Sequence, residues 1–196
     1  RDAPVSAVDS LIEQFDGFSF VHPTGVGEPL LAEGFWKIVD ALAGRKWPKL
    51  IFNTNGMLLT DKNVERLMRC PINLVSVSID AATPETYRKI RGSDMRKTLQ
   101  GAKRMAEALK PELFANGGPT HFQVSMVLMH ENIHEAPAFI DLAAEIGANI
   151  VYLEHLTEPH TPARFWTVDR DGFRFNYAEQ SLLGRPELAD PHVLKA

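Results

Sequence analysis

A glycine-rich segment followed by a carboxylate is the first feature of this chain that could bind a ligand. Residues 24–31 read Thr-Gly-Val-Gly-Glu-Pro-Leu-Leu, between an apolar run and an amphipathic run. Glycine lets the backbone approach a ligand closely, and a carboxylate is a strong acceptor for a charged amine. Gly25, Val26, Gly27 and Glu28 therefore predict a strand-end loop that offers backbone groups and an acid to an ammonium. The alternative is a tight turn in which Glu28 caps the following helix.

Two more polar segments follow later apolar runs. Residues 53–56 read Asn-Thr-Asn-Gly, and Asn55 with its glycine is also a common turn signal. Ser78 and Asp80 end the next run. Because ligands bind at the carboxyl ends of parallel strands, these side chains and Glu28 are expected at one edge of a sheet. The alternative for Ser78 and Asp80 is helix capping, or core polar groups with internal partners.

Two arginines and the histidines complete the candidates. Arg88 and Arg91 fall on or just after the next predicted helix, and either guanidinium can hold a carboxylate in a bidentate pair. Arg91, just before a glycine turn, is the preferred ligand, and Arg88 is expected in solvent. His130 and His134 are four residues apart in a strand-to-helix loop, without the His-Glu-x-x-His order of a metallopeptidase. A histidine metal site is not expected.

These residues need a scaffold of alternating strands and helices. The pattern predicts βα units with a parallel sheet. The predicted strands are 18–23, 50–53, 73–80, 121–129 and 150–155. The predicted helices are 3–15, 31–43, 61–69, 84–90, 95–109 and 134–146.

Two of these strands have one polar face. Ser76, Ser78 and Asp80 alternate with apolar residues, and Gln123 and Ser125 do the same in the next strand. One apolar and one polar face suit a barrel with helices outside and a ligand inside better than an open doubly wound sheet. We therefore expect an α/β fold with residues 1–156 as a partial barrel core. Residues 157–196 are expected to form an irregular extension or linker with one helix near 177–183.

Composition limits the class of protein. The chain has 196 residues, 44% of them hydrophobic, and a net charge of −4, typical of one soluble domain and not of a nucleic-acid binder. No apolar run reaches the roughly 20 residues that cross a membrane, and no secretory segment begins the chain. The expected location is cytoplasmic, without membrane or nucleic-acid partners. Cys70 is the only cysteine; it excludes a disulfide within the chain and is expected to be a small buried residue.

Taken in order, these segments resemble the radical SAM superfamily. The matching marks are residues 25–30 after one strand, 54–56 after the next, and 77–80 through Arg91-Gly92 after the third. The run from Ser78 to Gly92 resembles the SPASM-type members, which carry an additional cluster domain and modify peptides. The resemblance covers roughly residues 18–156. It implies a partial parallel (β/α)6 TIM-like barrel, of which this chain lacks the first βα unit.

The resemblance also implies cofactors and roles. The family binds S-adenosylmethionine beside a 4Fe-4S iron–sulfur cluster, cleaves it to a 5′-deoxyadenosyl radical and takes a hydrogen from a substrate. The substrate would be a peptide or small molecule, and the electron donor a flavodoxin or ferredoxin. Residues 25–28 would contact the methionyl amine, Ser78 and Arg91 its carboxylate, and residues 151–153 the adenine. Asn55, Asp80 and Tyr152 complete the implied cofactor-binding set.

One departure from the family is serious. The cluster-binding Cys-x-x-x-Cys-x-x-Cys loop has no counterpart in this sequence, and one cysteine cannot hold an iron–sulfur cluster. We therefore expect an internal piece of a longer enzyme, inactive alone and prone to self-association through an exposed strand edge at residues 18–23. The alternative is a degenerate, cluster-free barrel that serves as a binding or partner module. An ordinary barrel lyase or aldolase would require a lysine at a strand end, and no predicted strand ends in a lysine.

Overall fold

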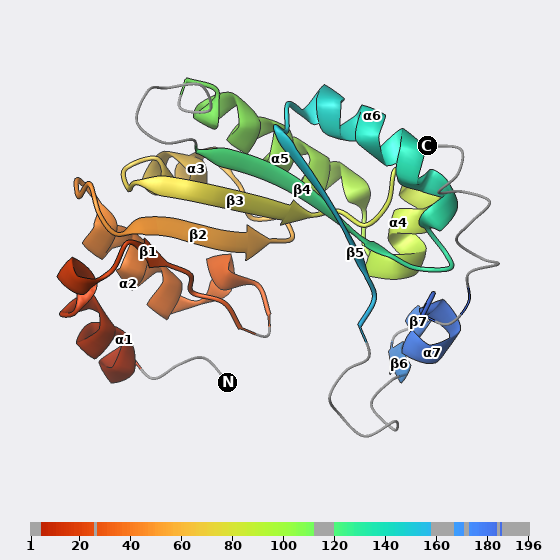
Figure 1. The fold of residues 1–196 in the computed structure, drawn as a ribbon, viewed down its shortest axis with the longest axis horizontal. Helices are drawn as coiled ribbons and strands as arrows, with labels where there is room; N and C mark the ends of the chain where they lie inside the picture. Colours follow the sequence, from red (N-terminus) through yellow and green to blue (C-terminus); the bar gives the residue numbers. More distant parts are fainter. Residues whose placement is uncertain are drawn as a thin grey trace.

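Five parallel strands form one open sheet in the order of the sequence, β1-β2-β3-β4-β5 (Figure 1). The computed structural model describes residues 5–25, 27–111, 120–157, 167–170, 173–183 and 185. The parallel α/β fold and the five predicted strands are confirmed. The strands are β1 (Phe20–Val21), β2 (Lys49–Thr54), β3 (Ile72–Ser78), β4 (His121–Leu128) and β5 (Ile150–His155).

Helices follow the strands and gather on one side of the sheet (Figure 1). The predicted helices are confirmed, with ends that shift by a few residues, as helix ends commonly do. Short 3-10 turns precede α2 and α6. The helices are α1 (Val5–Ile12), α2 (Glu33–Leu42), α3 (Asp61–Leu67), α4 (Pro84–Arg91), α5 (Met95–Leu109) and α6 (Ala136–Ile146), and the turns are η1 (Phe15–Gly17), η2 (Pro29–Leu31) and η3 (Ile133–Glu135).

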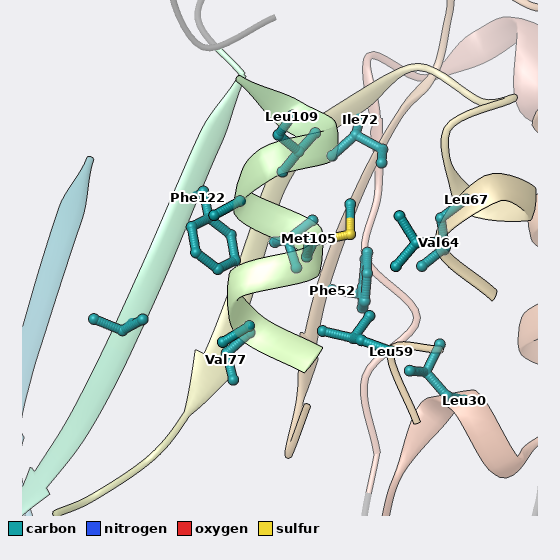
Figure 2. Close-up of a cluster of buried hydrophobic side chains, with 14 of the residues drawn as sticks. Leu30, Phe52, Leu59, Val64, Leu67, Ile72, Val77, Met105, Leu109 and Phe122 are labelled. Atoms are coloured by element: carbon teal, nitrogen blue, oxygen red, sulfur yellow. The ribbon is translucent and has the colours of Figure 1, made fainter. Parts of the chain in front are cut away.

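The hydrophobic core lies between the sheet and these helices. Met105 and Leu109 of α5 pack over strand residues that include Val77 and Phe122 (Figure 2). Val77 and Phe122 are fully buried, as is Phe52 of β2. Burial of a side chain of this size contributes about 1.5–3 kcal/mol, so this layer fixes which face of each strand points away from the helices.

The opposite face of the sheet is polar, as the alternation predicts. In the strand register Ser76 of β3 lies between Asn53 of β2 and Gln123 of β4. Gln123 donates from Nε2 to the Ser76 hydroxyl over 2.8 Å. One row further along, Ser125 of β4 lies between Ser78 and Tyr152.

Both edge strands expose apolar side chains. Phe20 of β1 is 49% exposed, and Tyr152 and Leu153 of β5 are 47% and 38% exposed. Successive residues of β5 point to opposite faces, so both of its faces reach solvent. The exposed edge predicted at residues 18–23 is present at β1.

The segment after the sheet forms structure that the sequence reading did not contain. Strands β6 (Thr167–Arg170) and β7 (Phe173–Asn176) make an antiparallel hairpin, and α7 (Tyr177–Gln180) is shorter than the predicted helix. Valine and aromatic residues favour strands, which accounts for the hairpin. The remainder of 157–196 lies largely outside the described residues. Among those that are described, no helix is long and apolar enough to cross a membrane.

Candidate functional site

The Glu28 carboxylate is tied to the end of β2. Its Oε1 atom accepts from the Thr54 hydroxyl at 2.6 Å and more weakly from the Leu30 amide at 3.3 Å. Its Oε2 atom accepts from the Asn55 amide at 2.7 Å. The capping alternative for Glu28 is thus partly correct, because Glu28 is the N-cap of η2 and accepts from the amide of Leu30. A carboxylate offers about four acceptor positions, so one remains on Oε2 for a ligand.

The glycines before Glu28 leave open space around the loop. A Cβ atom built on Gly25 or Gly27 would meet nothing within 4 Å. Gly27 has a φ of +120°, which side-chain-bearing residues rarely adopt. Val26 lies outside the described residues. Gly25 and Gly27 therefore offer backbone without a side chain near the carboxylate.

The loop after β2 is fixed by α5 behind it. A Cβ atom on Gly101 would lie 2.0 Å from the Gly56 carbonyl oxygen, so only glycine allows this approach. The Thr98 hydroxyl donates to the Asn55 carbonyl at 2.9 Å and lies 2.7 Å from the Tyr87 hydroxyl. Since the Asn55 amide also donates to Glu28, a chain of hydrogen bonds runs from α4 to Glu28.

Ser78 ends β3 with a hydroxyl that is only weakly engaged. Its Oγ atom lies 3.4 Å from the Ser125 hydroxyl, longer than a good hydroxyl hydrogen bond. Tyr152, the residue expected near an adenine, lies opposite Ser125 in the register and is 47% exposed. Ser78, Ser125 and Tyr152 thus form one polar row across three strands.

Asp80 and Arg91, both predicted as cofactor ligands, are paired with each other. Arg91 Nη2 lies 2.5 Å from Asp80 Oδ2, and the Val127 amide donates to Asp80 Oδ1 at 2.8 Å. Burial raises the pKa of Asp80 above its ordinary value, against the opposing effects of the Arg91 charge and the Val127 amide. Of the two alternatives for Asp80, helix capping is wrong, because Thr83 caps α4, and a buried polar group with internal partners is what the structure contains.

Arg91 keeps donors for another partner. Its Nε atom is buried and has no hydrogen-bond partner among the described residues, while the side chain as a whole is 30% exposed. Together with Asp80 it lines a pocket of about 310 Å³ whose other walls are apolar and include Phe173 and Phe175 of β7. Arg88, three residues earlier on α4, is exposed, as expected.

The strand register brings these groups to one end of the sheet. Thr54 lies opposite Val77, so the next residues, Asn55 and Ser78, follow side by side on strands about 4.8 Å apart. Glu28 bonds Asn55, and the Asp80–Arg91 pair begins two residues beyond Ser78. An acid, a hydroxyl and a guanidinium therefore lie at the same end of the sheet: Glu28 follows β1 and bonds the end of β2, Ser78 ends β3, and Arg91 is paired with Asp80 just beyond β3. Such a set complements an amino acid.

The chain offers no thiolate set for a metal cluster. Cys70, the single cysteine, is 7% exposed and follows α3 at the opposite end of β3. Burial raises the pKa of its thiol to about 12, so it is a protonated core residue, as expected. Within the described ranges, no three His, Cys, Asp or Glu side chains are grouped to hold a metal ion.

Two residues of the site region were missed by sequence reasoning. Asn132 and Glu135, in the connection between β4 and α6, are buried and bond the segment that follows β3. Their Asn-x-x-Glu spacing before a helix resembles a cap for α6, but Glu135 makes no side-chain cap there. The Asn-x-x-Glu spacing is visible in the sequence. The segment that these two side chains bond lies about 50 residues earlier and cannot be identified from the sequence alone.

Comparison with known families gives an independent result. The sequence model of the family described as the Radical SAM superfamily matches residues 5–143. A curated relative, the probable GTP 3′,8-cyclase of Methanocaldococcus jannaschii, is 28% identical over 131 residues, or 66% of this chain and 41% of the relative. Mycofactocin maturase MftC of Mycolicibacterium smegmatis is 32% identical over 152 residues, 76% of this chain and 36% of the relative. The chain thus spans about two fifths of these proteins.

Solved structures agree on the fold. The crystal structure of Streptococcus suis SuiB bound to S-adenosylmethionine superposes with a TM-score of 0.64 at 16% identity, covering 82% of this chain and 36% of that one. SuiB bound to its precursor peptide SuiA gives 0.63 at 17% identity, with 81% and 34% covered.

Proposed function

This chain belongs to the radical SAM superfamily, and we propose that the carboxyl ends of β1, β2 and β3 bind the amino-acid end of S-adenosylmethionine. The family's cofactors are S-adenosylmethionine and a 4Fe-4S cluster. The bound cofactor supplies, after reductive cleavage, a 5′-deoxyadenosyl radical that takes a hydrogen from the substrate. What supports the proposal is the placement of Glu28, Ser78 and the Asp80–Arg91 pair at the same end of the sheet.

Glu28 is proposed to receive the methionyl ammonium. Three donors from Thr54, Asn55 and Leu30 hold the carboxylate in place and leave one acceptor position. The open space at Gly25 and Gly27 gives an ammonium room to approach. An ammonium bound to an ionised carboxylate forms a charge-assisted hydrogen bond, about twice as strong as a neutral one.

Arg91 and Ser78 are proposed to hold the methionyl carboxylate. The Arg91 side chain is 30% exposed, and Asp80 holds one donor of its planar fork, Nη2, so other donors of the fork remain for a carboxylate oxygen. Within the described part of the chain the Ser78 hydroxyl makes one long contact, so it can turn to donate. Tyr152, on the same row of the sheet, is proposed to lie beside the adenine.

The cluster must be held by residues other than those of this chain. The single cysteine is buried, protonated and remote from the strand ends. We therefore assign this chain the binding of the cofactor's amino-acid end and no step at the cluster.

The substrate is proposed to be a peptide, with a small molecule as the wider class. The polar face of the sheet carries the amide side chains of Asn53 and Gln123, and Gln123 is held by the buried Ser76 hydroxyl. Such groups pair with peptide amides, whereas a nucleoside triphosphate requires a concentration of cations. The proposed electron donor is a flavodoxin or ferredoxin.

Ligands that lack parts of the cofactor test this proposal. Equilibrium dialysis of the protein that carries this chain would compare S-adenosylmethionine with its decarboxylated form, which has no carboxylate. Arg91→Gln should weaken binding of S-adenosylmethionine about tenfold or more and leave the decarboxylated ligand unchanged. Arg88→Gln, on the same helix, is the matched control. Equal losses for both ligands, or no loss, would refute the role of Arg91.

A further inference from the structure

Two buried side chains from the β4–α6 connection reach across to the segment between β3 and α4. Glu135 is 5% exposed and Asn132 fully buried. Their partners lie about 50 residues earlier in the sequence, at separations of 49 to 53. The segment that they hold begins with Asp80 and leads into the helix that ends with Arg91.

Glu135 secures the start of α4. Its Oε2 atom accepts from the Ala82 amide at 2.6 Å and the Thr83 amide at 3.1 Å. Its Oε1 atom accepts from the hydroxyls of Thr83 and Thr86, each at 2.6 Å. Burial disfavours the charged form, but these hydrogen bonds outweigh it and lower the pKa of Glu135. Four donors thus surround one ionised, buried carboxylate.

Asn132 secures the turn that carries Asp80. Its Nδ2 group donates to the carbonyls of Asp80 and Val127, each at 2.8 Å, and its Oδ1 atom accepts from the Met129 amide at 2.7 Å. Asp80 has a φ of +65°, a backbone conformation that costs energy in residues with a side chain. The bonds from Asn132 and Val127 hold that conformation.

Fixing the start of α4 also places its far end. The helix has eight residues, from Pro84 to Arg91, and a helix of this length is a stiff rod of about 12 Å. The Tyr87 hydroxyl anchors its middle to Thr98. The guanidinium position is therefore set by contacts at the start and middle of the helix rather than by Arg91 alone.

We infer that Asn132 and Glu135 are positioning residues for the Asp80–Arg91 pair and so for the carboxylate of the cofactor. The inference rests on the proposed function. Neither residue is assigned a contact with the cofactor; both act through the β3–α4 segment. If these residues only stabilised the fold, their loss would change the affinity for both ligands equally. If they position Arg91, their loss weakens the affinity for the ligand that carries a carboxylate.

The test uses Glu135→Gln, which keeps the side-chain size but removes the charge and replaces an acceptor with a donor. Dissociation constants for S-adenosylmethionine and its decarboxylated form are measured by equilibrium dialysis on the protein that carries this chain. The expected result is an approximately tenfold weaker affinity for S-adenosylmethionine with unchanged affinity for the decarboxylated form. Hydrogen exchange at the Ala82 and Thr83 amides should accelerate in the same variant.

Two further variants keep the test decisive. Thr86→Val removes one hydroxyl donor to Glu135 with little change in shape, and should give a smaller loss of the same selectivity if Glu135→Gln does not fold. Glu131→Gln removes the half-buried ion-pair partner of Lys89, a residue of α4, and should change neither affinity. Folded Glu135 and Thr86 variants with wild-type affinities, or with equal losses for both ligands, would overturn the inference. Failure of Arg91→Gln to discriminate would instead reject the proposed function itself.

Discussion

Arg91 Nη2 lies 2.5 Å from Asp80 Oδ2, so the guanidinium proposed to bind a carboxylate already has one carboxylate partner. The pair is held at both ends, by the Val127 amide on Asp80 and by the helix on Arg91. Because Asp80 engages one side of the planar group, the orientation of the remaining donors is fixed before a ligand arrives. Preorganisation of this kind lowers the entropy lost on binding.

Replacing Asp80 should destabilise the protein through Arg91. Asp80→Asn tolerates the positive φ but removes the charge that faces the guanidinium. We expect a loss of about 2 kcal/mol in the free energy of unfolding, below the ~3–5 kcal/mol typical of fully buried pairs, because the Arg91 side chain is 30% exposed. Urea denaturation measures it. Asp94→Asn, which breaks the exposed pair with Arg96, should have little effect; equal losses would contradict this account.

Gly101 should not tolerate alanine. The added Cβ atom would lie 2.0 Å from the Gly56 carbonyl oxygen, a backbone atom that cannot move alone. Gly101→Ala should therefore cost about 1–3 kcal/mol of stability and displace the Asn55–Gly56 loop. Gly34→Ala in α2 is the control, since its Cβ would meet only the Val8 side chain at 3.1 Å. Thermal melts of the two variants should differ clearly in midpoint, and similar midpoints would rule out the close contact.

The Glu135 carboxylate should make the free energy of unfolding decrease at acidic pH. Its pKa is below the ordinary value of 4.5, so as pH falls the unfolded chain takes up the proton first. Its contribution is complete above pH 4.5 or so and is lost as pH falls through the folded-state pKa. Urea unfolding of wild type and Glu135→Gln should differ by about 1.5–3 kcal/mol near pH 7, and the difference should shrink steadily below pH 4.5. A difference that stays constant over this range would contradict the assignment.

Cys70 should report global unfolding. Its thiol is 7% exposed and its pKa is raised to about 12, and only thiolates react readily with alkylating reagents. We expect slow modification by iodoacetamide near pH 8 and rapid modification in denaturant. Because the reaction then proceeds through the unfolded state, the logarithm of its rate should rise linearly with urea concentration even below the unfolding transition. Fast modification of the native protein would show that the α3–β3 connection opens locally.

The exposed edge at β1 should promote self-association. Phe20 is 49% exposed beside unpaired backbone groups. Phe20→Lys should shift the chain toward monomer in sedimentation velocity experiments. Ile140→Lys, which removes a similarly exposed apolar side chain from α6 at 46%, should not. A wild-type chain that sediments as one monomeric species would remove the basis for this prediction.

Local patterns in the sequence predicted the sheet well. Alternation in β3 placed Val77 inside and Ser78 on the polar face, and both positions are confirmed. The bounds of α5 are those predicted, because Asp94 caps its start and its apolar spacing is regular. The hairpin β6–β7 was not predicted, although its two strands are separated by Asp171-Gly172, a strong signal for a two-residue hairpin turn; the charged residues in its short strands obscure the strand pattern.

Long-range partners could not be read from the sequence. The choice of Arg91 over Arg88 followed from the glycine turn, but its pairing with Asp80 depends on how α4 folds back on β3. Glu135 was invisible for the same reason, since its four donors lie about 50 residues away. Local signals specify elements, whereas partners across the sheet are specified only by the packed fold.

The two-residue ladder between β1 and β2 makes Glu28 a structural tether as well as a proposed ligand contact. Its hydrogen bonds to Thr54 and Asn55 attach to β2 a loop that follows a very short strand. Ligand binding at Glu28 and the order of this loop are therefore thermodynamically coupled, because both depend on the same carboxylate. A compound that neutralises Glu28 or competes for its hydrogen bonds would weaken the attachment of the loop to the end of β2. A compound that forms an additional bond to Glu28 would strengthen that attachment.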